Sequence, residues 1–171
     1  MFKNKKYNNF VIGVECSTLA AQELFDEYIG TGNYTIENRS TTCSIYSAYD
    51  NRLVVIVCDI FADELTPSLI GGHVSFVWDR AALTALHPAN HLRYIEKLRQ
   101  LSEVHSQYLI SVYWHPEPPD QGPPFSISTE CISKLFPHDQ VLQLDDIDAK
   151  NERWADTAFE QLRECCYCIE T

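Results

Sequence analysis

The sequence predicts an α/β protein with a mostly parallel central sheet, one antiparallel strand, and helices on both faces. The first observation is a set of nearly continuous apolar segments, which are typical of strands buried on both faces: residues 10–14, 52–59, 73–79 and 108–114. The second is that helical patterns alternate with these segments. The third is an early pair of strands, close enough in sequence to form a hairpin, which supplies the antiparallel strand.

The first half of the chain is expected to contain one helix and the hairpin. The helix follows the first strand, with apolar residues from Leu19 onward, and ends at Gly30. Residues 41–48 alternate between apolar and polar, whereas residues 52–59 are nearly all apolar. The turn residues at 49–51 join these two segments, so they predict a hairpin.

The second half alternates strands and helices around a proline-rich loop. Apolar residues recur with a period near 3.6 from residue 92 to 105, which predicts a helix. Five prolines fall within residues 115–125, so this segment is expected to be an irregular surface loop or a protein-binding element. The remaining elements are expected in this order: strands at 73–79 and 108–114, a helix at 129–135, a strand at 140–144 and a final helix at 154–165.

Composition is typical of one soluble globular domain. We expect this domain at residues 10–165, with an N-terminal tail at 1–9 and a cysteine-containing tail at 166–171. The formal net charge of −11 repels phosphate backbones, which argues against a nucleic-acid partner. An odd count of seven cysteines indicates free thiols, and no apolar run reaches the length of a membrane span. These features predict a cytoplasmic protein.

The first strand and helix flank a glycine in the order found in a phosphate-binding loop. That loop has glycine, four residues, and then Gly-Lys-Ser/Thr. Counted from Gly13, the last three positions hold Thr18, Leu19 and Ala20. Leucine and alanine remove the ammonium group that binds phosphate and the hydroxyl that ligates magnesium. We therefore expect no bound nucleotide, no cofactor and no metal.

Short motifs after this loop resemble those of the Ras-like small GTPases, in the family's order. Thr35-Ile36-Glu37 resembles the Thr-Ile-Glu of the first switch segment. Asp59 ends an apolar strand and matches the aspartate that supports magnesium. Ala62 stands in place of the glycine whose amide meets the γ-phosphate.

The resemblance continues to the end of the chain. Glu117 is the one residue that keeps any chemistry of the family's guanine-recognition motif. Asp148-Ala149-Lys150 resembles the Ser-Ala-Lys that precedes the last helix of a small GTPase. The resemblance implies a Ras-like P-loop fold over nearly the whole chain.

The lost phosphate contacts, taken with this resemblance, imply a pseudo-GTPase that neither binds nor hydrolyses GTP. Such a protein would be a non-catalytic interaction module, a scaffold or a GTPase mimic, whose partner is a GTPase regulator, effector or complex subunit. The candidate partner-binding residues lie on the switch-like segment and its neighbour: Thr35, Ile36, Glu37, Tyr46 and Tyr49. Two alternatives stay open, namely an atypical GTPase that binds nucleotide weakly, and a small acidic inhibitor or immunity-type protein.

Three cysteines follow the predicted last helix, where small GTPases carry lipidated cysteines. They are Cys165, Cys166 and Cys168. Glu170 occupies a position at which a prenylation motif has an aliphatic residue, which disfavours prenylation. Palmitoylation and plain thiols remain as alternatives. We expect membrane association only through these cysteines.

Overall fold

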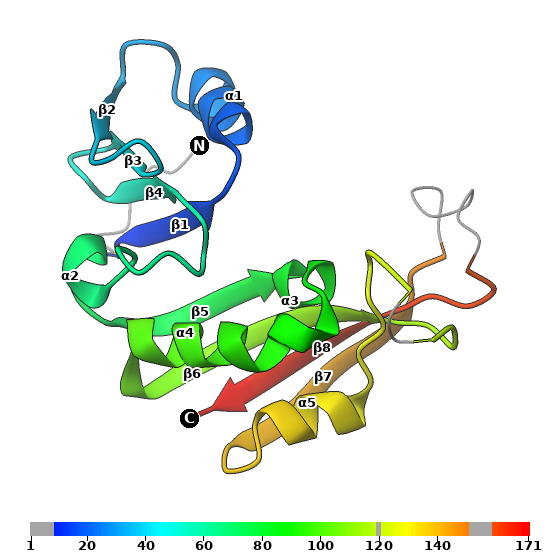
Figure 1. Ribbon diagram of the computed structural model, residues 1–171. Helices are drawn as coiled ribbons and strands as arrows, with labels where there is room; N and C mark the ends of the chain where they lie inside the picture. Colours follow the sequence, from blue (N-terminus) through cyan, green and yellow to red (C-terminus); the bar gives the residue numbers. More distant parts are fainter. Residues whose placement is uncertain (1–8, 119–120, 151–158) are drawn as a thin grey trace. The chain divides into compact units, whose positions relative to one another are not determined.

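A computed structural model describes residues 9–118, 121–150 and 159–171 of the chain. It contains two compact units, residues 1–65 and residues 66–171 (Figure 1). The expected tail at residues 1–9 lies outside the described residues except for its last position. Among the described helices, none is long and apolar enough to cross a membrane.

The first unit is a four-stranded sheet with one helix. Its sheet has the strand order β1-β4-β3-β2, in which β1 is parallel to β4 and the other pairs are antiparallel. The predicted hairpin is therefore confirmed as β3 and β4. The elements are β1 (Val11–Glu15), α1 (Thr18–Tyr28), β2 (Tyr34–Asn38), β3 (Ser44–Ala48) and β4 (Leu53–Val57).

Helix α1 packs an aromatic residue into the core of this unit. The helix begins after Ser17, whose hydroxyl accepts a hydrogen bond from the Ala20 amide at 3.2 Å. Phe25 is fully buried, and its ring lies 5.2 Å from that of Tyr34 and 5.3 Å from that of Tyr46. These contacts hold α1 against β2 and β3.

Gly13 lies inside strand β1 and not at the start of a loop. It is paired with Val55 of β4, and the strand continues to Glu15. A side chain at Gly13 would place its Cβ 3.2 Å from a methyl group of Val55, which is tighter than ordinary contact. Close packing between neighbouring strands thus explains this glycine.

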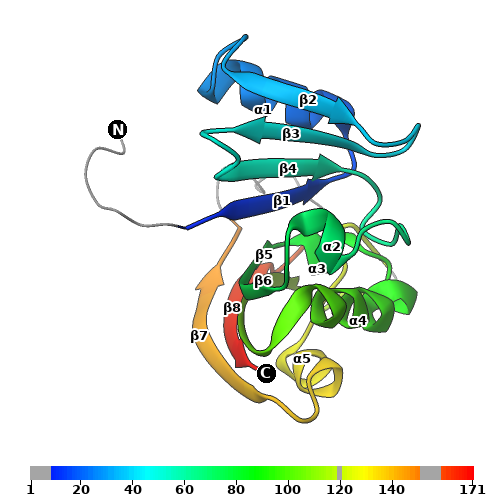
Figure 2. The same cartoon turned by 90° about the vertical axis from the view of Figure 1, so that its left-hand side faces the viewer.

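The second unit is a four-stranded sheet of order β5-β6-β8-β7. Strands β5 and β6 are parallel, and β8 is antiparallel to both of its neighbours, β6 and β7. Helices α4 and α5 lie side by side against one face of this sheet (Figures 1 and 2). The elements are α2 (Pro67–Ile70), β5 (Val74–Arg80), α3 (Ala82–Ala85), the short 3-10 helix η1 (Pro88–Asn90), α4 (His91–Leu101), β6 (Ser102–Trp114), α5 (Thr129–Leu135), β7 (Gln140–Asp148) and β8 (Arg163–Glu170).

Helix α4 ends four residues earlier than the sequence predicted. Its apolar side chains Tyr94, Ile95, Leu98 and Leu101 are buried on one face. The chain turns into β6 at Ser102, whose hydroxyl donates a hydrogen bond to the Leu98 carbonyl at 2.8 Å. The end of the helix was misplaced because the pattern included Val104, which the structure exposes.

The predicted final helix is wrong where the structure describes it. Residues 163–165 belong to strand β8, and the first part of the predicted helix, residues 154–158, lies outside the described residues. Cys165, Tyr167 and Ile169 are buried, and the residues between them are more exposed. This period of two is that of a strand. The segment predicted to be a C-terminal tail is thus most of a strand inside the sheet.

The predicted fold class is also wrong. The prediction was one mostly parallel sheet with a single antiparallel strand, whereas each unit has its own mixed sheet. The error has a physical cause, because β7 and β8 return antiparallel to β6 where a further parallel strand was expected. Strand β5 is an outer strand of its sheet, and its Phe76 and Trp78 are exposed.

Candidate functional site

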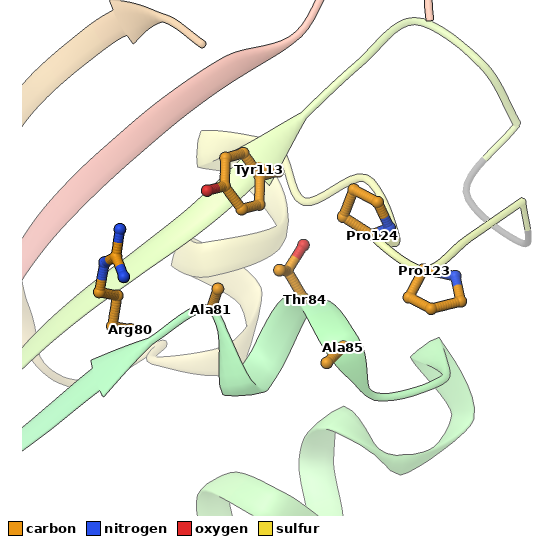
Figure 3. Close-up of a pocket in the computed structure, with 7 residues that line it drawn as sticks. All are labelled: Arg80, Ala81, Thr84, Ala85, Tyr113, Pro123 and Pro124. Atoms are coloured by element: carbon orange, nitrogen blue, oxygen red, sulfur yellow. The ribbon is translucent and has the colours of Figure 1, made fainter. Parts of the chain in front are cut away.

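A pocket of about 290 Å³ lies at the carboxyl ends of the parallel strands β5 and β6 (Figure 3). Ligands of open α/β sheets bind at this end of the strands, where loops and helix starts converge. All seven lining residues belong to the second unit: Arg80, Ala81, Thr84, Ala85, Tyr113, Pro123 and Pro124. Among the described residues that line the pocket, the alanines and prolines form small, flat apolar walls, and Arg80 carries a charge.

A buried aspartate holds the wall of the pocket that α3 forms. Asp79 is only 3% exposed, and it accepts hydrogen bonds from the amides of Ala82 at 2.7 Å and Leu83 at 3.2 Å. It also accepts one from the Tyr94 hydroxyl at 3.0 Å. Burial raises the pKa of Asp79, and the hydrogen bonds oppose that rise.

Ala81 makes the turn between β5 and α3 with an unusual backbone. Its φ of 67° lies in the left-handed region, which is costly for a residue with a Cβ. Its amide donates to the Ser111 carbonyl of β6 at 2.9 Å. Neighbouring contacts therefore fix this turn at the pocket floor.

The proline-rich loop supplies the opposite wall. Phe125 exchanges two hydrogen bonds with Thr84 of α3, through its amide at 2.7 Å and its carbonyl at 2.5 Å. The Ile127 amide donates to the Tyr113 carbonyl at 2.9 Å. Figure 3 shows Pro123 and Pro124 facing α3 across the pocket. The loop is therefore fastened to both α3 and β6.

Arg80 and Tyr113 give the pocket its polar end. Arg80 ends β5, and Tyr113 lies near the end of β6. In Figure 3, the Tyr113 hydroxyl points toward the side of the pocket on which Arg80 lies. A guanidinium in this position can bind an anionic group of a small ligand, because it donates up to five hydrogen bonds.

In the first unit, two carboxylates lie at the carboxyl ends of the adjacent parallel strands: Glu15 is the last residue of β1, and Asp59 follows β4. Glu15 accepts a hydrogen bond from the Ser17 amide at 2.8 Å, and Asp59 accepts one from the Phe61 amide at 2.8 Å. The Cys58 amide donates to the Glu15 carbonyl at 2.9 Å, which joins the two strand ends. A carboxylate oxygen can accept more than one hydrogen bond, so both groups can accept further donors.

The residues that the sequence grouped into a nucleotide pocket fall in both units of the chain. Thr18, Leu19 and Ala20 form the first turn of α1, and Leu19 is exposed. Asp59 and Ala62 lie on the turn after β4, where the Ala62 amide donates to the Asp59 carbonyl at 2.9 Å. These residues form ordinary helix-start and turn contacts.

Three further predicted pocket residues, and Glu117, lie in the second unit. Asp148 ends β7 and accepts a hydrogen bond from the Lys150 amide at 2.9 Å, and Ala149 is buried. The Lys150 ammonium donates to the Phe159 carbonyl at 2.7 Å. Glu117 lies beside His115 in the proline-rich loop.

The candidate partner-binding residues differ in exposure. Thr35, Ile36 and Glu37 lie on β2, the outer strand of its sheet, and all three are exposed. Tyr46 is buried against Phe25, so its ring is not on the surface.

Tyr49 and the three candidate lipidation cysteines complete the predicted set. Tyr49 is exposed in the turn after β3, with a φ of 54°. Cys165, Cys166 and Cys168 all lie in β8, and burial raises the pKa of the Cys165 thiol to about 11. These cysteines are strand residues between β6 and β7.

The sequence reasoning missed the pocket residues. Arg80 directly follows an apolar strand, so the rule that sites form at carboxyl ends of strands was a signal that could have found it. Thr84 and Ala85 carried no signal of their own. The prolines were noticed, but as a surface loop or a protein-binding element.

Comparisons with known proteins identify the family. A family model described as Thiopurine S-methyltransferase (TPMT) matches residues 5–171. The thiopurine S-methyltransferase of Mus musculus is 30% identical over 162 residues, which are 93% of this chain and 65% of that protein. That of Teredinibacter turnerae is 35% identical over 127 residues, 74% of this chain and 55% of that protein. The chain therefore spans less than two thirds of the length of these relatives.

Solved structures support a methyltransferase fold. A putative O-methyltransferase from Nostoc punctiforme superposes with a TM-score of 0.55 at 11% identity, covering 96% of this chain and 45% of that one. A Haemonchus contortus phosphoethanolamine N-methyltransferase, solved with S-adenosylhomocysteine, gives 0.55 at 10% identity, covering 97% and 44%. At these identities, the likeness bears on the fold alone.

These matches correct the Ras-like resemblance. The expected P-loop fold, the pseudo-GTPase function and the GTPase regulator, effector or complex subunit as a partner all depended on short motifs. The expectation of a non-catalytic scaffold is wrong for the same reason, since the matching family is named for an enzyme. The family model extends over nearly the entire chain, and this protein belongs to the thiopurine S-methyltransferase family.

Proposed function

We propose that this protein takes part in methyl transfer from S-adenosylmethionine to the sulfur of a small aromatic thiol. The observation that carries the proposal is the family match over residues 5–171. The pocket at the carboxyl ends of β5 and β6 supports it, because its flat apolar walls suit a planar ring.

The residues of the first unit fit the nucleoside part of S-adenosylmethionine. A carboxylate at the end of a strand in an α/β sheet accepts hydrogen bonds from ribose hydroxyls. Glu15 has this position, directly before α1, and Asp59 follows the neighbouring parallel strand. When bound, S-adenosylmethionine supplies an electrophilic methyl group on a sulfonium. We assign ribose binding to Glu15, with Asp59 as a second acceptor.

The pocket of the second unit would prepare the acceptor. Methyl transfer would require the acceptor sulfur as a thiolate, so the thiol proton would first pass to solvent. A cation close to the sulfur favours the thiolate over the thiol. Arg80 is the charged residue among the described residues that line the pocket, and we assign it this role.

The experiment measures binding and transfer separately. Titration calorimetry with S-adenosylhomocysteine tests Glu15→Gln against Glu23→Gln, a control on the exposed side of α1. We expect about a tenfold weaker binding for Glu15→Gln only, which corresponds to one lost charge-assisted hydrogen bond. Transfer of a labelled methyl group to 6-mercaptopurine is the activity assay. A folded protein that neither binds S-adenosylhomocysteine nor transfers the label would contradict the proposal.

We also propose a cytoplasmic location. In the part of the chain that the structure describes, all seven cysteines are free thiols. Free thiols persist in a reducing compartment.

A further inference from the structure

A buried histidine fastens the proline-rich wall of the pocket. The His115 side chain is fully buried, and its Nε2 lies 2.9 Å from the carbonyl oxygen of Pro124, a residue that lines the pocket. On the other side of the ring, Nδ1 lies 2.8 Å from Oε2 of Glu117. The ring is also stacked on Phe159, with centroids 4.4 Å apart. We call these four residues the His115 clamp.

The contact with the Pro124 carbonyl requires a proton on Nε2 of the ring. The Pro124 carbonyl can only accept a hydrogen bond, so Nε2 has to donate to it. Nδ1 and Glu117 Oε2 have no other partner among the residues that the structure describes. The two atoms lie 2.8 Å apart, so the Glu117 carboxylate closes the side of the ring opposite Pro124.

The clamp determines where the pocket wall lies. Pro124, which the His115 ring contacts, directly precedes Phe125, and Phe125 is hydrogen-bonded to Thr84 of α3. The His115 backbone is fixed as well, because Ser126 Oγ donates to its carbonyl at 2.6 Å and accepts from its amide at 3.0 Å. Strand β6 ends just before His115, so the position of the ring is fixed by the sheet. The contact between the ring and Pro124 therefore holds the prolines at a fixed distance from the sheet.

We propose that His115 is a positioning residue for the acceptor pocket. It acts through the Pro124 carbonyl and sets the width between the prolines and α3. It does not touch the substrate, because its side chain is fully buried. This role deepens the proposed function and depends on it for its effect on catalysis, whereas the clamp itself is a property of the fold.

Two substitutions separate positioning from packing. His115→Phe keeps a ring on Phe159 but removes the donor to the Pro124 carbonyl and the ring nitrogen beside Glu117 Oε2. His115→Gln places an amide donor near the position of Nε2 and restores the contact with Pro124. His138 lies on the surface after α5, so His138→Gln is the matched control.

We expect the KM for 6-mercaptopurine to rise about tenfold in His115→Phe, as for one buried hydrogen bond lost. The kcat should stay within about twofold, since the reacting groups are untouched. His115→Gln should return the KM to within about threefold of that of the original protein. An unchanged KM in His115→Phe, in a protein that transfers methyl groups, overturns the proposal.

If the protein transfers no methyl group, two measurements still test whether the His115 clamp exists. Nitrogen-15 NMR of the histidine rings should show one ring whose Nε2 proton is protected from exchange with solvent, and this signal should be absent in His115→Phe. Exchange of the Phe125 amide hydrogen, which is bonded to Thr84, should be more than about tenfold faster in His115→Phe than in His115→Gln. Equal exchange in the two variants, or a ring without a proton on Nε2, shows that no clamp exists. Absent activity with a positive clamp result removes only the proposed function.

Discussion

Replacing Asp79 by alanine should destabilise the second unit more than any other single polar change near the pocket. Asp79 accepts three hydrogen bonds, from the amides of Ala82 and Leu83 and from the hydroxyl of Tyr94. Both Asp79 and Tyr94 are nearly inaccessible to water. In Asp79→Ala, the donors that lose this acceptor therefore gain few hydrogen bonds to water.

The expected loss follows from these contacts. Three hydrogen bonds at about 1 kcal/mol each give a fall of about 3 kcal/mol in the free energy of unfolding. Tyr94→Phe removes a single donor and should cost about 1 kcal/mol. In the double variant, the Tyr94 hydroxyl is no longer buried without a partner. The double variant should therefore be no less stable than Asp79→Ala alone.

Urea unfolding followed by circular dichroism measures these free energies, with equal slopes required for the comparison. The alternative explanation is that Asp79 stabilises the second unit mainly through its charge and not through its hydrogen bonds. If the Asp79→Ala variant loses less than about 1 kcal/mol, or if Tyr94→Phe costs as much as Asp79→Ala, the hydrogen-bond account fails.

Four further predictions concern pH, packing, catalysis and thiol reactivity. Burial raises the pKa of Asp79, so the folded state holds the proton of this carboxyl group more tightly than the unfolded state does. The free energy of unfolding of the original protein, relative to that of Asp79→Asn, should therefore fall as pH rises from about 4 toward neutral. Urea titrations in which this difference grows over the same range would contradict the prediction. Phe25→Ala should cost about 3 to 5 kcal/mol in the first unit, measured by urea unfolding, because the ring is fully buried. Arg80→Ala should lower kcat/KM for 6-mercaptopurine by about 10- to 100-fold without changing the melting temperature; unchanged kcat/KM would remove Arg80 from the reaction. Exposed Cys16 should react with a disulfide reagent such as DTNB in the folded protein, whereas Cys58, whose pKa burial raises to about 11, should react only after unfolding.

The sequence was sufficient for elements whose pattern matched a local period. The strand, helix and hairpin of the first unit appear where they were predicted, because cap, turn and apolar residues agree there. Helix α4 was found but overextended by Val104, which is apolar yet exposed. The sequence alone does not show whether a single apolar residue lies on the buried or the exposed face of an element, because that depends on the neighbouring elements.

The predictions that were wrong concerned segments whose sequence pattern fits two different structures. Residues 163–170 have an alternating pattern that was assigned to a helix and a tail, since the partner strands β6 and β7 are distant in sequence. Thr35-Ile36-Glu37 resembled a switch, but three residues are too few to separate a motif from an outer strand. The pocket could not be predicted because Thr84 and Phe125 meet only through tertiary structure.

The outer strand β5 has a consequence for the behaviour of the protein in solution. Residues 74–78 contain no charged residue and no proline, and Phe76 and Trp78 are exposed. Natural sheets usually protect such a strand with lysine, proline or a covering segment, because its free amides and carbonyls can pair with another chain. Within the sheet of the second unit, β5 has a strand partner on one side only, and its exposed Phe76 and Trp78 add apolar surface. We expect this strand to favour reversible association in concentrated samples, which light scattering over a dilution series would detect and the Phe76→Lys substitution should suppress.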